Sequence, residues 1–425
     1  MSYTFTIQVF RDLTKQYPTW EALHTYLESE EGGLFRVVDK TDSLCLIRYD
    51  KGVSHMNLPH SKWFRSVVWN TATHRPVCVA PPKSSTTALP TVTEDHAYHV
   101  QPWLDGFMIN TFKCAGDDTL YITSRSRLDA SGRFYSAKTF RQLFIESYTG
   151  WKTKVDDTLE WLIQVEAKNF PSPDSSRGET VIFVSFVVQH MEHRNVLPIE
   201  ENRLWAVHQG TVYEDGTIRI LDAPPAPPNT IWNCIESLPS PPLGDISSWI
   251  QEQIQTCPQA VSGVVVKDAD GQRWKVASDA FRMVQSLRGN TPHSLERFVQ
   301  LYSQNVIPMY LQYYPEDSSA FSLHMECMNE LVKWMYLHYR NLHVFHTASL
   351  SDIDKMFHPH LYAIHGHYLT HLRPVNGKIS ANDVHDYLRK QPWQRVSFLL
   401  HRVEDVYFEN IKYALEQESS LNRME

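Results

Sequence analysis

The chain has 425 residues, of which 42% are hydrophobic and 21% charged, and its formal net charge is −8 at pH 7. This composition is typical of a folded protein of about two or three domains, and it excludes disordered, collagen-like and fibrous classes. The acidic balance argues against a uniformly basic surface for indiscriminate nucleic-acid binding, but it allows one confined basic groove.

Sequence features that would indicate a membrane or secreted protein are missing. No apolar run approaches the roughly 20 residues of a membrane-spanning helix, and the N-terminus shows no basic region followed by an apolar signal core. The six cysteines are widely spaced and include no CxxC pair, which argues against a disulfide framework or a structural zinc module. We therefore expect reduced thiols, no membrane partner and a cytoplasmic or nuclear protein.

Residues 1–278 carry short β-branched and aromatic runs separated by turns, which predict strands. Asp215-Gly216 and Asp270-Gly271 each separate two alternating runs and predict hairpins. Periodic apolar residues predict helices between the strands. The predicted strands are Ser43–Tyr49, Ser66–Trp69, Val77–Ala80, Gly106–Lys113, Thr119–Ser124, Glu179–Gln189, Leu204–Tyr213, Thr217–Leu221 and Gly263–Lys267, and the predicted helices are Thr19–Glu28, Ser136–Glu146 and Val155–Lys168.

Two segments in this part of the chain predict surface loops or extended connectors. Pro81–Asp95 is rich in Pro, Ser and Thr, and Pro224–Pro242 holds seven prolines in nineteen residues. Proline removes a backbone donor and resists both helix and central strand. The 224–242 loop is also a candidate site for a protein partner that recognises proline-rich segments.

After residue 279 the apolar spacing becomes helical, with helix-start residues such as Thr291-Pro292 and Ser351-Asp352. The sequence therefore predicts an α+β protein with a sheet-rich domain at 1–278 and an all-helical domain at 279–425. The predicted helices of the second domain are Ala280–Leu287, His293–Gln304, Ser319–His338, Ser351–Leu372, Ala381–Lys390 and Gln394–Gln417.

Common catalytic signatures are absent from the sequence: it contains no Walker loop, GxGxxG, GxSxG or HExxH. A histidine-rich run at 358–371 invites a metal hypothesis, because His367 and His371 are one helical turn apart. No carboxylate or cysteine completes a ligand set locally, so we favour packed, hydrogen-bonded histidines while metal binding stays open. The histidines of the run are His358, His360, His365, His367 and His371.

A more informative pattern is an ordered set of segments in the first domain: FRSVVWNTATHRPVCVAPPKS (64–84), WLDGFMINTF (103–112), LYITSRSRLDASGRF (120–134), VIFVSFVVQHMEHRNVL (181–197), RLWAVHQGTVYEDG (203–216) and VSGVVVKDADGQRWKV (261–276). This set resembles the covalent nucleotidyltransferase superfamily, which comprises RNA ligases, DNA ligases and mRNA-capping guanylyltransferases. It is most similar to the RNA-ligase-like proteins of large DNA viruses. The resemblance covers roughly 35–278 and implies two antiparallel sheets that clasp a nucleotide.

The resemblance also shows which reactive groups are missing. The acid and glycine of the family's KxDG motif correspond to Asp105 and Gly106, but Trp103 stands where the nucleophilic lysine belongs. Val187 and Ser262 stand where the third and fourth motifs carry acids. The nearest lysines, Lys83 and Lys113, are poorly placed as substitutes, since Lys113 lies eight residues beyond Asp105, roughly 25 Å along a strand.

Residues that bind phosphate in the family are retained. The EHRNV stretch with Glu192 and Arg194 resembles the ligases' ENRIV, and Arg273-Trp274-Lys275 corresponds to KxK, whose cations neutralise phosphates. Trp103 is interpreted either as a core residue that fills the space of the lysine or as a base-stacking platform. The candidate nucleotide- or RNA-binding residues are Trp103, Asp105, Gly106, Arg125, Arg127, Lys267, Arg273 and Lys275, with Arg288, His293 and Arg297 as RNA contacts of the helical domain.

The leading hypothesis is an RNA-ligase-like pseudoenzyme that binds RNA, an RNA end or a nucleotide without covalent nucleotidyl transfer, with no assigned catalytic residue or metal site. The resemblance implies a viral protein in the host cytoplasm. One alternative is an active RNA ligase or guanylyltransferase with displaced catalytic groups, which would need ATP or GTP with Mg2+. The other is a structural or protein-interaction component built on the ligase fold.

Overall fold

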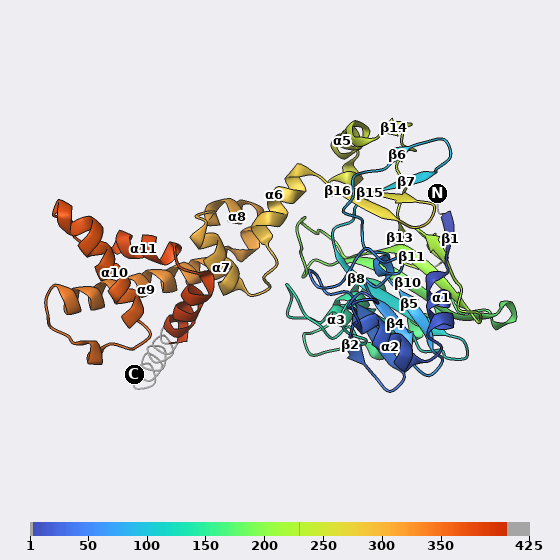
Figure 1. Cartoon of the computed structure of the whole chain (residues 1–425), viewed down its shortest axis with the longest axis horizontal. Coiled ribbons are helices and arrows are strands. Elements are labelled where there is room, and N and C mark those ends of the chain that lie inside the picture. Colours follow the sequence, from blue (N-terminus) through green and yellow to red (C-terminus); the bar gives the residue numbers. More distant parts are fainter. Residues whose placement is uncertain (1–2, 229, 406–425) are drawn as a thin grey trace, which may run out of the picture. The chain divides into compact units, whose positions relative to one another are not determined.

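The computed structural model describes residues 3–228 and 230–405, which form mixed α and β structure with largely antiparallel sheets and a helical C-terminal region (Figure 1). The chain divides into two compact units, Met1–Met283 and Val284–Glu425. This division falls inside helix α6 (Asp279–Arg288), whereas the sequence suggested a boundary after residue 278.

The largest sheet of the first unit has strand β10 at its centre. Val181 and Phe183 of β10 enter one hydrophobic core, while Ile182 and Val184 enter another, so both faces of the strand are buried. Burial on both faces explains why residues 181–188 are apolar except for Ser185 and do not alternate with polar residues. The strand order is β1 (Tyr3–Ile7), β12 (Ile218–Asp222), β11 (Arg203–Tyr213), β10 (Glu179–Gln189), β8 (Phe107–Cys114) and β9 (Tyr121–Ser124), with β13 (Trp232–Cys234) parallel to β11.

A second, four-stranded sheet shares the core on one side of β10. Helices α1 (Val9–Gln16) and α2 (Trp20–Glu28) pack with this sheet, and Figure 1 shows them beside β4 and β5. Phe10 and Trp69 are fully buried there, with ring centroids 6.3 Å apart. The strand order is β2 (Arg36–Lys40), β3 (Leu44–Arg48), β4 (Val67–Asn70) and β5 (Arg75–Val79).

The core on the other side of β10 is covered by α3 (Phe140–Thr149) and α4 (Glu160–Glu166). Helix α3 begins later than the sequence predicted because Thr139 caps it, forming a capping box with Gln142. Helix α4 is shorter than predicted, since the Gln142 amide donates to the backbone carbonyls of Lys154 (3.0 Å) and Asp157 (2.7 Å). Those carbonyls are therefore held outside a helix.

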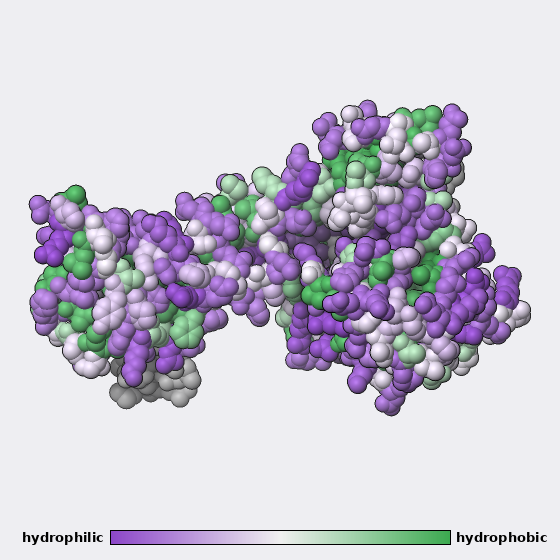
Figure 2. Space-filling view, in the orientation of Figure 1, coloured by the Kyte–Doolittle hydropathy of each residue, from purple (hydrophilic) through white to green (hydrophobic). Residues whose placement is uncertain are grey.

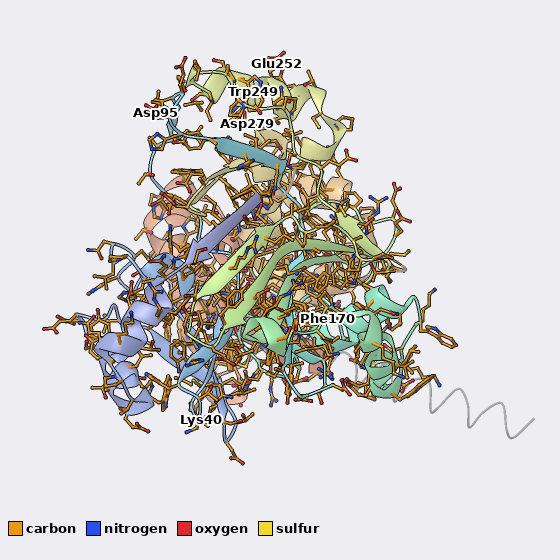
Figure 3. All side chains as sticks on the ribbon, turned by 90° about the vertical axis from the view of Figure 1, so that its right-hand side faces the viewer. Lys40, Asp95, Phe170, Trp249, Glu252 and Asp279 are labelled. Carbon is orange, nitrogen blue, oxygen red and sulfur yellow. The ribbon has the colours of Figure 1, made fainter. Side chains whose placement is uncertain are left out.

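A small sheet, β16 (Arg273–Ala277), β15 (Gly263–Asp268) and β7 (Tyr98–Pro102), presents two contrasting faces. Val264 and Val266 face a core covered by helix α5 (Ser247–Thr256), which carries Trp249 and Glu252 in Figure 3. The alternate residues of β15 and β16 present lysine and arginine on the opposite face. Three short strands occur in or next to the segments predicted as irregular. β6 (Thr91–Val92) lies within 81–95, β13 lies within 224–242, and β14 (Gly244–Asp245) follows that segment.

The regular secondary structure of the second unit's described residues is helical. Helix α9 is its longest, and Phe298, Phe321 and Met335 are fully or almost fully buried. The sequence missed α8, and it started α10 too early, because residues 353–357 form turns before His358. The helices are α7 (Ser294–Ser303), α8 (Ile307–Tyr313), α9 (Ser318–His343), α10 (His358–His367), α11 (Ala381–Arg389) and residues 393–405; the rest of the predicted helix to residue 417 lies outside the described residues.

The face of each unit seen in Figure 2 is predominantly polar, with hydrophilic side chains over most of it. Within 3–228 and 230–405, no helix combines the length and apolar character needed to cross a lipid bilayer.

Acid should destabilise the first unit through His208 of β11, which is buried beside the Phe183 ring. Burial lowers the pKa of His208 to about 3, while an unfolded histidine has a pKa near 6.5. Below pH 6.5 the unfolded chain therefore binds a proton that the folded chain does not, and stability falls as the pH falls. We expect a loss of about 2 kcal/mol between pH 7 and pH 5.

Urea unfolding of the wild type and of His208→Gln at both pH values measures this effect. The wild type should lose more stability between pH 7 and pH 5 than the variant does. Equal losses would show that His208 is not responsible, whatever the absolute stability of the variant.

Candidate cationic nucleotide-binding site

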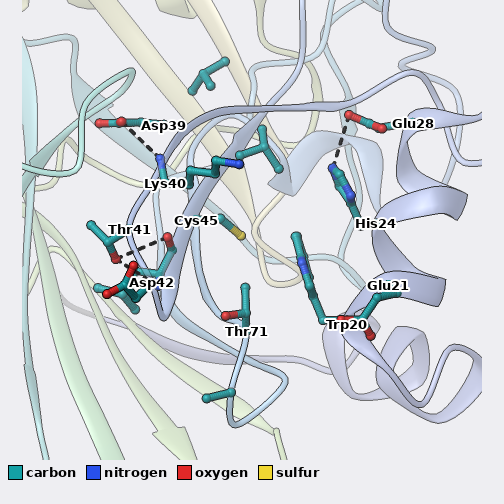
Figure 4. Close-up of a pocket in the computed structure, with 14 residues that line it drawn as sticks. Trp20, Glu21, His24, Glu28, Asp39, Lys40, Thr41, Asp42, Cys45 and Thr71 are labelled. Carbon is teal, nitrogen blue, oxygen red and sulfur yellow. Dashed lines mark hydrogen bonds and ion pairs between the residues drawn. The ribbon is translucent and has the colours of Figure 1, made fainter.

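A large open pocket of the first unit lies between helix α2 and the β2–β3 hairpin, with a volume of about 920 Å3. Figure 4 shows Trp20 and His24 on the helix side, opposite Lys40 and Asp42. Its lining includes four carboxylates, those of Glu21, Glu28, Asp39 and Asp42. Their negative charge makes this pocket unsuited to phosphate.

Five cationic side chains gather elsewhere in the unit, and we call them the cationic cluster: Arg48, Arg65, Arg125, Arg273 and Lys275. Burial together with Arg273 and Arg125 lowers the pKa of Arg65 to about 10. Partial desolvation and the charges of Arg273 and Arg65 lower the pKa of Lys275, although its side chain is exposed at the edge of the cluster. Burial and Arg125 likewise lower the pKa of Arg48. Each member of the cluster is therefore close enough to at least one other member to be repelled by its positive charge.

Backbone hydrogen bonds bring the segments of the cluster together. The Tyr49 N–H donates to the Phe64 carbonyl (2.7 Å), which joins the end of β3 to the segment before β4. The Ser85 N–H donates to the Arg273 carbonyl (2.7 Å), and the Trp103 N–H donates to the Gly263 carbonyl (2.9 Å). Segments distant in sequence thus meet at the charged face of the small sheet.

The two cations of the KxK-like motif share that face because they are two residues apart on β16. Arg273 and Lys275 pair with Lys267 and Val265 of β15, whereas the intervening Trp274 packs with the core under α5. Side chains two residues apart on a strand lie on the same face, so Arg273 and Lys275 place two neighbouring positive charges there.

Three carboxylates act on the cluster from beyond ion-pair distance: Asp222 on Arg273, Asp105 on Lys275 and Asp50 on Arg48. Across 3–228 and 230–405, none of its five members forms an ion pair with a carboxylate, and the buried Nε atoms of Arg48, Arg125 and Arg273 have no hydrogen-bond partner. Arg273 is buried and Arg48, Arg65 and Arg125 are partly buried, so their mutual repulsion is costly unless a counter-ion offsets it. The arrangement can therefore bind an anion and gain stability from it.

Two aromatic rings lie under these cations. The Arg125 guanidinium lies 4.8 Å and the Lys83 ammonium 5.7 Å from the centroid of Tyr49. The Lys275 ammonium lies 4.3 Å from the centroid of Trp103, which also packs on Phe281 at 5.0 Å. Trp103 is thus a partly exposed ring that carries a cation.

The acid and glycine after Trp103 hold the fold together. The Asp105 carboxylate accepts the N–H groups of Val196 (2.9 Å) and Leu197 (2.8 Å), so it anchors the EHRNV segment, and its burial raises its pKa. A side chain on Gly106 would put Cβ 2.5 Å from the Val188 carbonyl oxygen of β10. Asp105 therefore fixes the position of residues 196–197, and Gly106 allows the chain to pass close to β10.

Other candidates from the first domain have protein partners. Lys267 is buried, and its Nζ donates to the Asp222 carboxylate (2.8 Å) and to the side-chain amide oxygen Oε1 of Gln101 (2.7 Å). Arg127 is exposed and lies 3.9 Å from Asp39. Glu192 accepts from the Lys138 ammonium (2.7 Å), which Glu146 also contacts. Lys267 is thus neutralised internally and separate in role from the cluster.

Val187 and Ser262, which stand where the third and fourth motifs carry acids, supply no carboxylate, and Lys113 is engaged elsewhere. Val187 is apolar, Ser262 is buried, and the buried Lys113 ammonium donates to the Ser172 hydroxyl (3.2 Å). Lys83 is different, because it lies over Tyr49 close to Arg125.

Sequence reasoning did not select Arg48, Tyr49, Arg65 or Lys83. Arg65 and Lys83 fall inside the quoted FRSVVWNTATHRPVCVAPPKS segment, and Arg48 and Tyr49 are the last two residues of the predicted strand Ser43–Tyr49. Their positions at the ends of strands were the available signal, since strand ends place side chains at the edge of a sheet.

The candidates of the helical unit require a correction. Arg288 and Arg297 are only 6% and 4% exposed, and each donates to Asp317 (3.0 Å) and to the Tyr310 hydroxyl (2.6 and 3.0 Å). Burial therefore assigns both a structural role instead of RNA contact. His293 is exposed at the start of α7.

The histidine-rich segment makes protein contacts. His358 Nε2 lies 2.8 Å from the Ile353 carbonyl oxygen, His360 Nδ1 lies 2.8 Å from the Tyr387 hydroxyl, and the His365 ring stacks on His343 at 3.9 Å. Among the described residues, no group of three or more His, Cys, Asp or Glu is arranged to hold a metal ion.

The first unit thus combines a cationic cluster that forms no ion pair among the described residues with two aromatic rings, Tyr49 and Trp103, that contact its cations. These features are chemically suited to a phosphate-bearing aromatic ligand. No protein-family model and no curated protein sequence matches the chain.

Proposed function

We propose that the first unit is an RNA-ligase-like module that binds a nucleotide or RNA end through its phosphates, without forming a covalent bond to it. On this proposal the small sheet and the large sheet are the two antiparallel sheets of the nucleotidyltransferase fold. The protein would work in the cytoplasm on RNA.

The observation that carries the proposal is the cationic cluster. Its members repel one another, lack ion-pair partners among the described residues, and include Arg273 and Lys275 of the ligase-like KxK motif. Guanidinium groups match phosphate geometry and bind it through charge-assisted hydrogen bonds. A bound phosphate would also raise the pKa of Lys275 and draw a proton onto its amine.

The non-covalent part of the proposal depends on Trp103. The family's chemistry needs a lysine at that position, and an indole ring has no nucleophilic amine. The ring instead offers a face to an aromatic base once Lys275 engages a phosphate, and such stacking contributes roughly 1–3 kcal/mol per base.

A second candidate function, covalent nucleotidyl transfer, is favoured by one specific contact. The Lys275 ammonium lies 4.3 Å from the Trp103 centroid, its side chain is exposed, and the charges of Arg273 and Arg65 add to partial desolvation in lowering its pKa. Desolvation beside other cations is a recognised way to activate a lysine nucleophile. Lys275 would then replace the missing nucleophile: its amine would attack the α-phosphate of ATP or GTP, supplied with Mg2+, form a phosphoramidate and release pyrophosphate.

Removing one cluster charge should weaken binding. We expect Lys275→Gln to lower the affinity for a 5′-phosphorylated oligoribonucleotide by roughly tenfold, because one charge-assisted phosphate contact contributes about 1.5–3 kcal/mol. Fluorescence anisotropy at several salt concentrations measures the affinity. The slope of log K against log salt should fall by about 0.7 for one lost contact.

Lys40→Gln is the matched control, since it removes an exposed lysine that lines the acidic pocket. It should bind RNA like the wild type. Equal affinity of Lys275→Gln and wild type would refute the assignment. An absence of any RNA or nucleotide affinity in the wild type would favour the protein-interaction alternative, with the 224–242 segment as its first candidate surface.

A further inference from the structure

A second pocket of the first unit, of about 390 Å3, has arginines as its only charged lining residues. Arg36, Arg48 and Arg127 line it together with Ser126, Val37 and Val38. No carboxylate lines it, in contrast to the acidic pocket beside α2. Val37 and Val38 line both pockets, so strand β2 separates an acidic pocket from a basic one.

The two arginines from the β2–β3 sheet stand directly opposite each other. Arg36 pairs with Arg48 in the antiparallel register of β2 and β3. Like charges at directly opposite positions destabilise a sheet unless something offsets them. Arg36 also contributes to the lowered pKa of Arg48, after burial and Arg125.

Each exposed arginine of this pocket has one acidic neighbour outside the lining. Arg36 is 3.2 Å from Asp50, and Arg127 is 3.9 Å from Asp39, whose other oxygen accepts the Leu128 N–H (2.9 Å). Both arginine side chains are more than half exposed, at 55% and 57%. Surface pairs of this kind are weak, so a phosphate can replace them at small cost.

Arg48 links this pocket to the cationic cluster. It lines the pocket, its charge acts on that of Arg125, and its buried Nε has no hydrogen-bond partner. The cations therefore form a continuous series from Arg36 and Arg127, through Arg48 and Arg125, to the rest of the cluster. A single phosphate occupies only one part of such a series, whereas a strand with successive phosphates can occupy all of it.

We infer that the Arg36–Arg48–Arg127 pocket is a second phosphate subsite, which binds a backbone phosphate of a single RNA strand whose terminal nucleotide lies at the cationic cluster. This inference rests on the proposed function. On this inference the ligand is an RNA strand with at least two phosphate groups. The cationic cluster binds its terminal nucleotide, and the second subsite binds a phosphate of the adjoining chain.

The test uses the full chain with Arg36→Gln and Arg127→Gln combined, and two probes: adenosine 5′-monophosphate and a short 5′-phosphorylated oligoadenylate. The variant should bind the oligonucleotide roughly tenfold more weakly and bind the mononucleotide like the wild type. Its salt slope for the oligonucleotide should fall by about 1.4, which corresponds to two lost contacts at about 0.7 each. Lys275→Gln should weaken both probes.

The combined variant Lys40→Gln and Lys51→Gln is the control, because it removes two exposed lysines of the same unit. It should leave both affinities unchanged. The inference is overturned if the arginine variant binds the oligonucleotide normally, if it loses both probes equally, or if the wild type binds both probes equally well. If the wild type binds neither probe, the proposed function itself fails.

Discussion

Replacing Asp317 by alanine is expected to destabilise the helical unit by about 3–5 kcal/mol. Asp317 is the acceptor shared by the buried Arg288 and Arg297, with Nη1–Oδ2 distances of 3.0 Å from each, and by the Tyr310 hydroxyl. Its removal leaves two buried guanidinium groups without that counter-charge, which costs more than the contacts themselves contribute. Thermal or urea unfolding followed by circular dichroism measures the loss.

Asp386→Ala is the control for this prediction, since it removes an exposed pair with Arg389 (3.5 Å) in the same unit. Surface pairs contribute about 0–1 kcal/mol, so this variant should stay close to the wild type. If Asp317→Ala were as stable as Asp386→Ala, Arg288 and Arg297 would have to be accessible to solvent, and their assignment as RNA contacts would be open again.

The second large effect is expected in the first unit, where Asp222→Ala should cost about 3–5 kcal/mol. The carboxylate of Asp222 holds the buried Lys267 ammonium at 2.8 Å and accepts the Gln101 amide at 3.0 Å. These contacts join β12 of the large sheet to the charged face of the small sheet. Urea unfolding of the variant measures the cost of leaving Lys267 charged and buried.

The double variant Asp222→Ala with Lys267→Met separates loss of charge balance from loss of packing. Methionine is apolar and similar in length to lysine, so the double variant should be more stable than Asp222→Ala alone. A double variant less stable than Asp222→Ala would show that Lys267 stabilises the fold without its partner.

Local rules predicted much of the strand structure. The Asp215-Gly216 and Asp270-Gly271 turns do join antiparallel strands, and the predicted strand Glu179–Gln189 coincides with β10. These signals are contained within a few neighbouring residues. Helix ends were predicted less well, since the Gln142 contacts that shorten α4 connect residues more than ten positions apart.

In the candidate site, too, contacts between residues far apart in the sequence could not be predicted. The spacing of Arg273 and Lys275 predicts their shared strand face, but nothing in the sequence reveals that Lys267 is neutralised by Asp222, 45 residues earlier. Arg288 and Arg297 became candidates for RNA contact only through the resemblance, since accessory domains of that superfamily hold RNA. Their burial follows from one distant acid, Asp317, which local patterns do not identify.

The absence of a covalent step is the central claim, and label transfer tests it most directly. The protein is incubated with α-32P-labelled ATP or GTP and Mg2+, and retained label is compared under native and denaturing conditions. We predict label retained with the native protein and fully released on denaturation, with native retention reduced in Lys275→Gln. Label that survives denaturation, is released by acid and disappears in Lys275→Gln would contradict the claim and identify Lys275 as a displaced nucleophile.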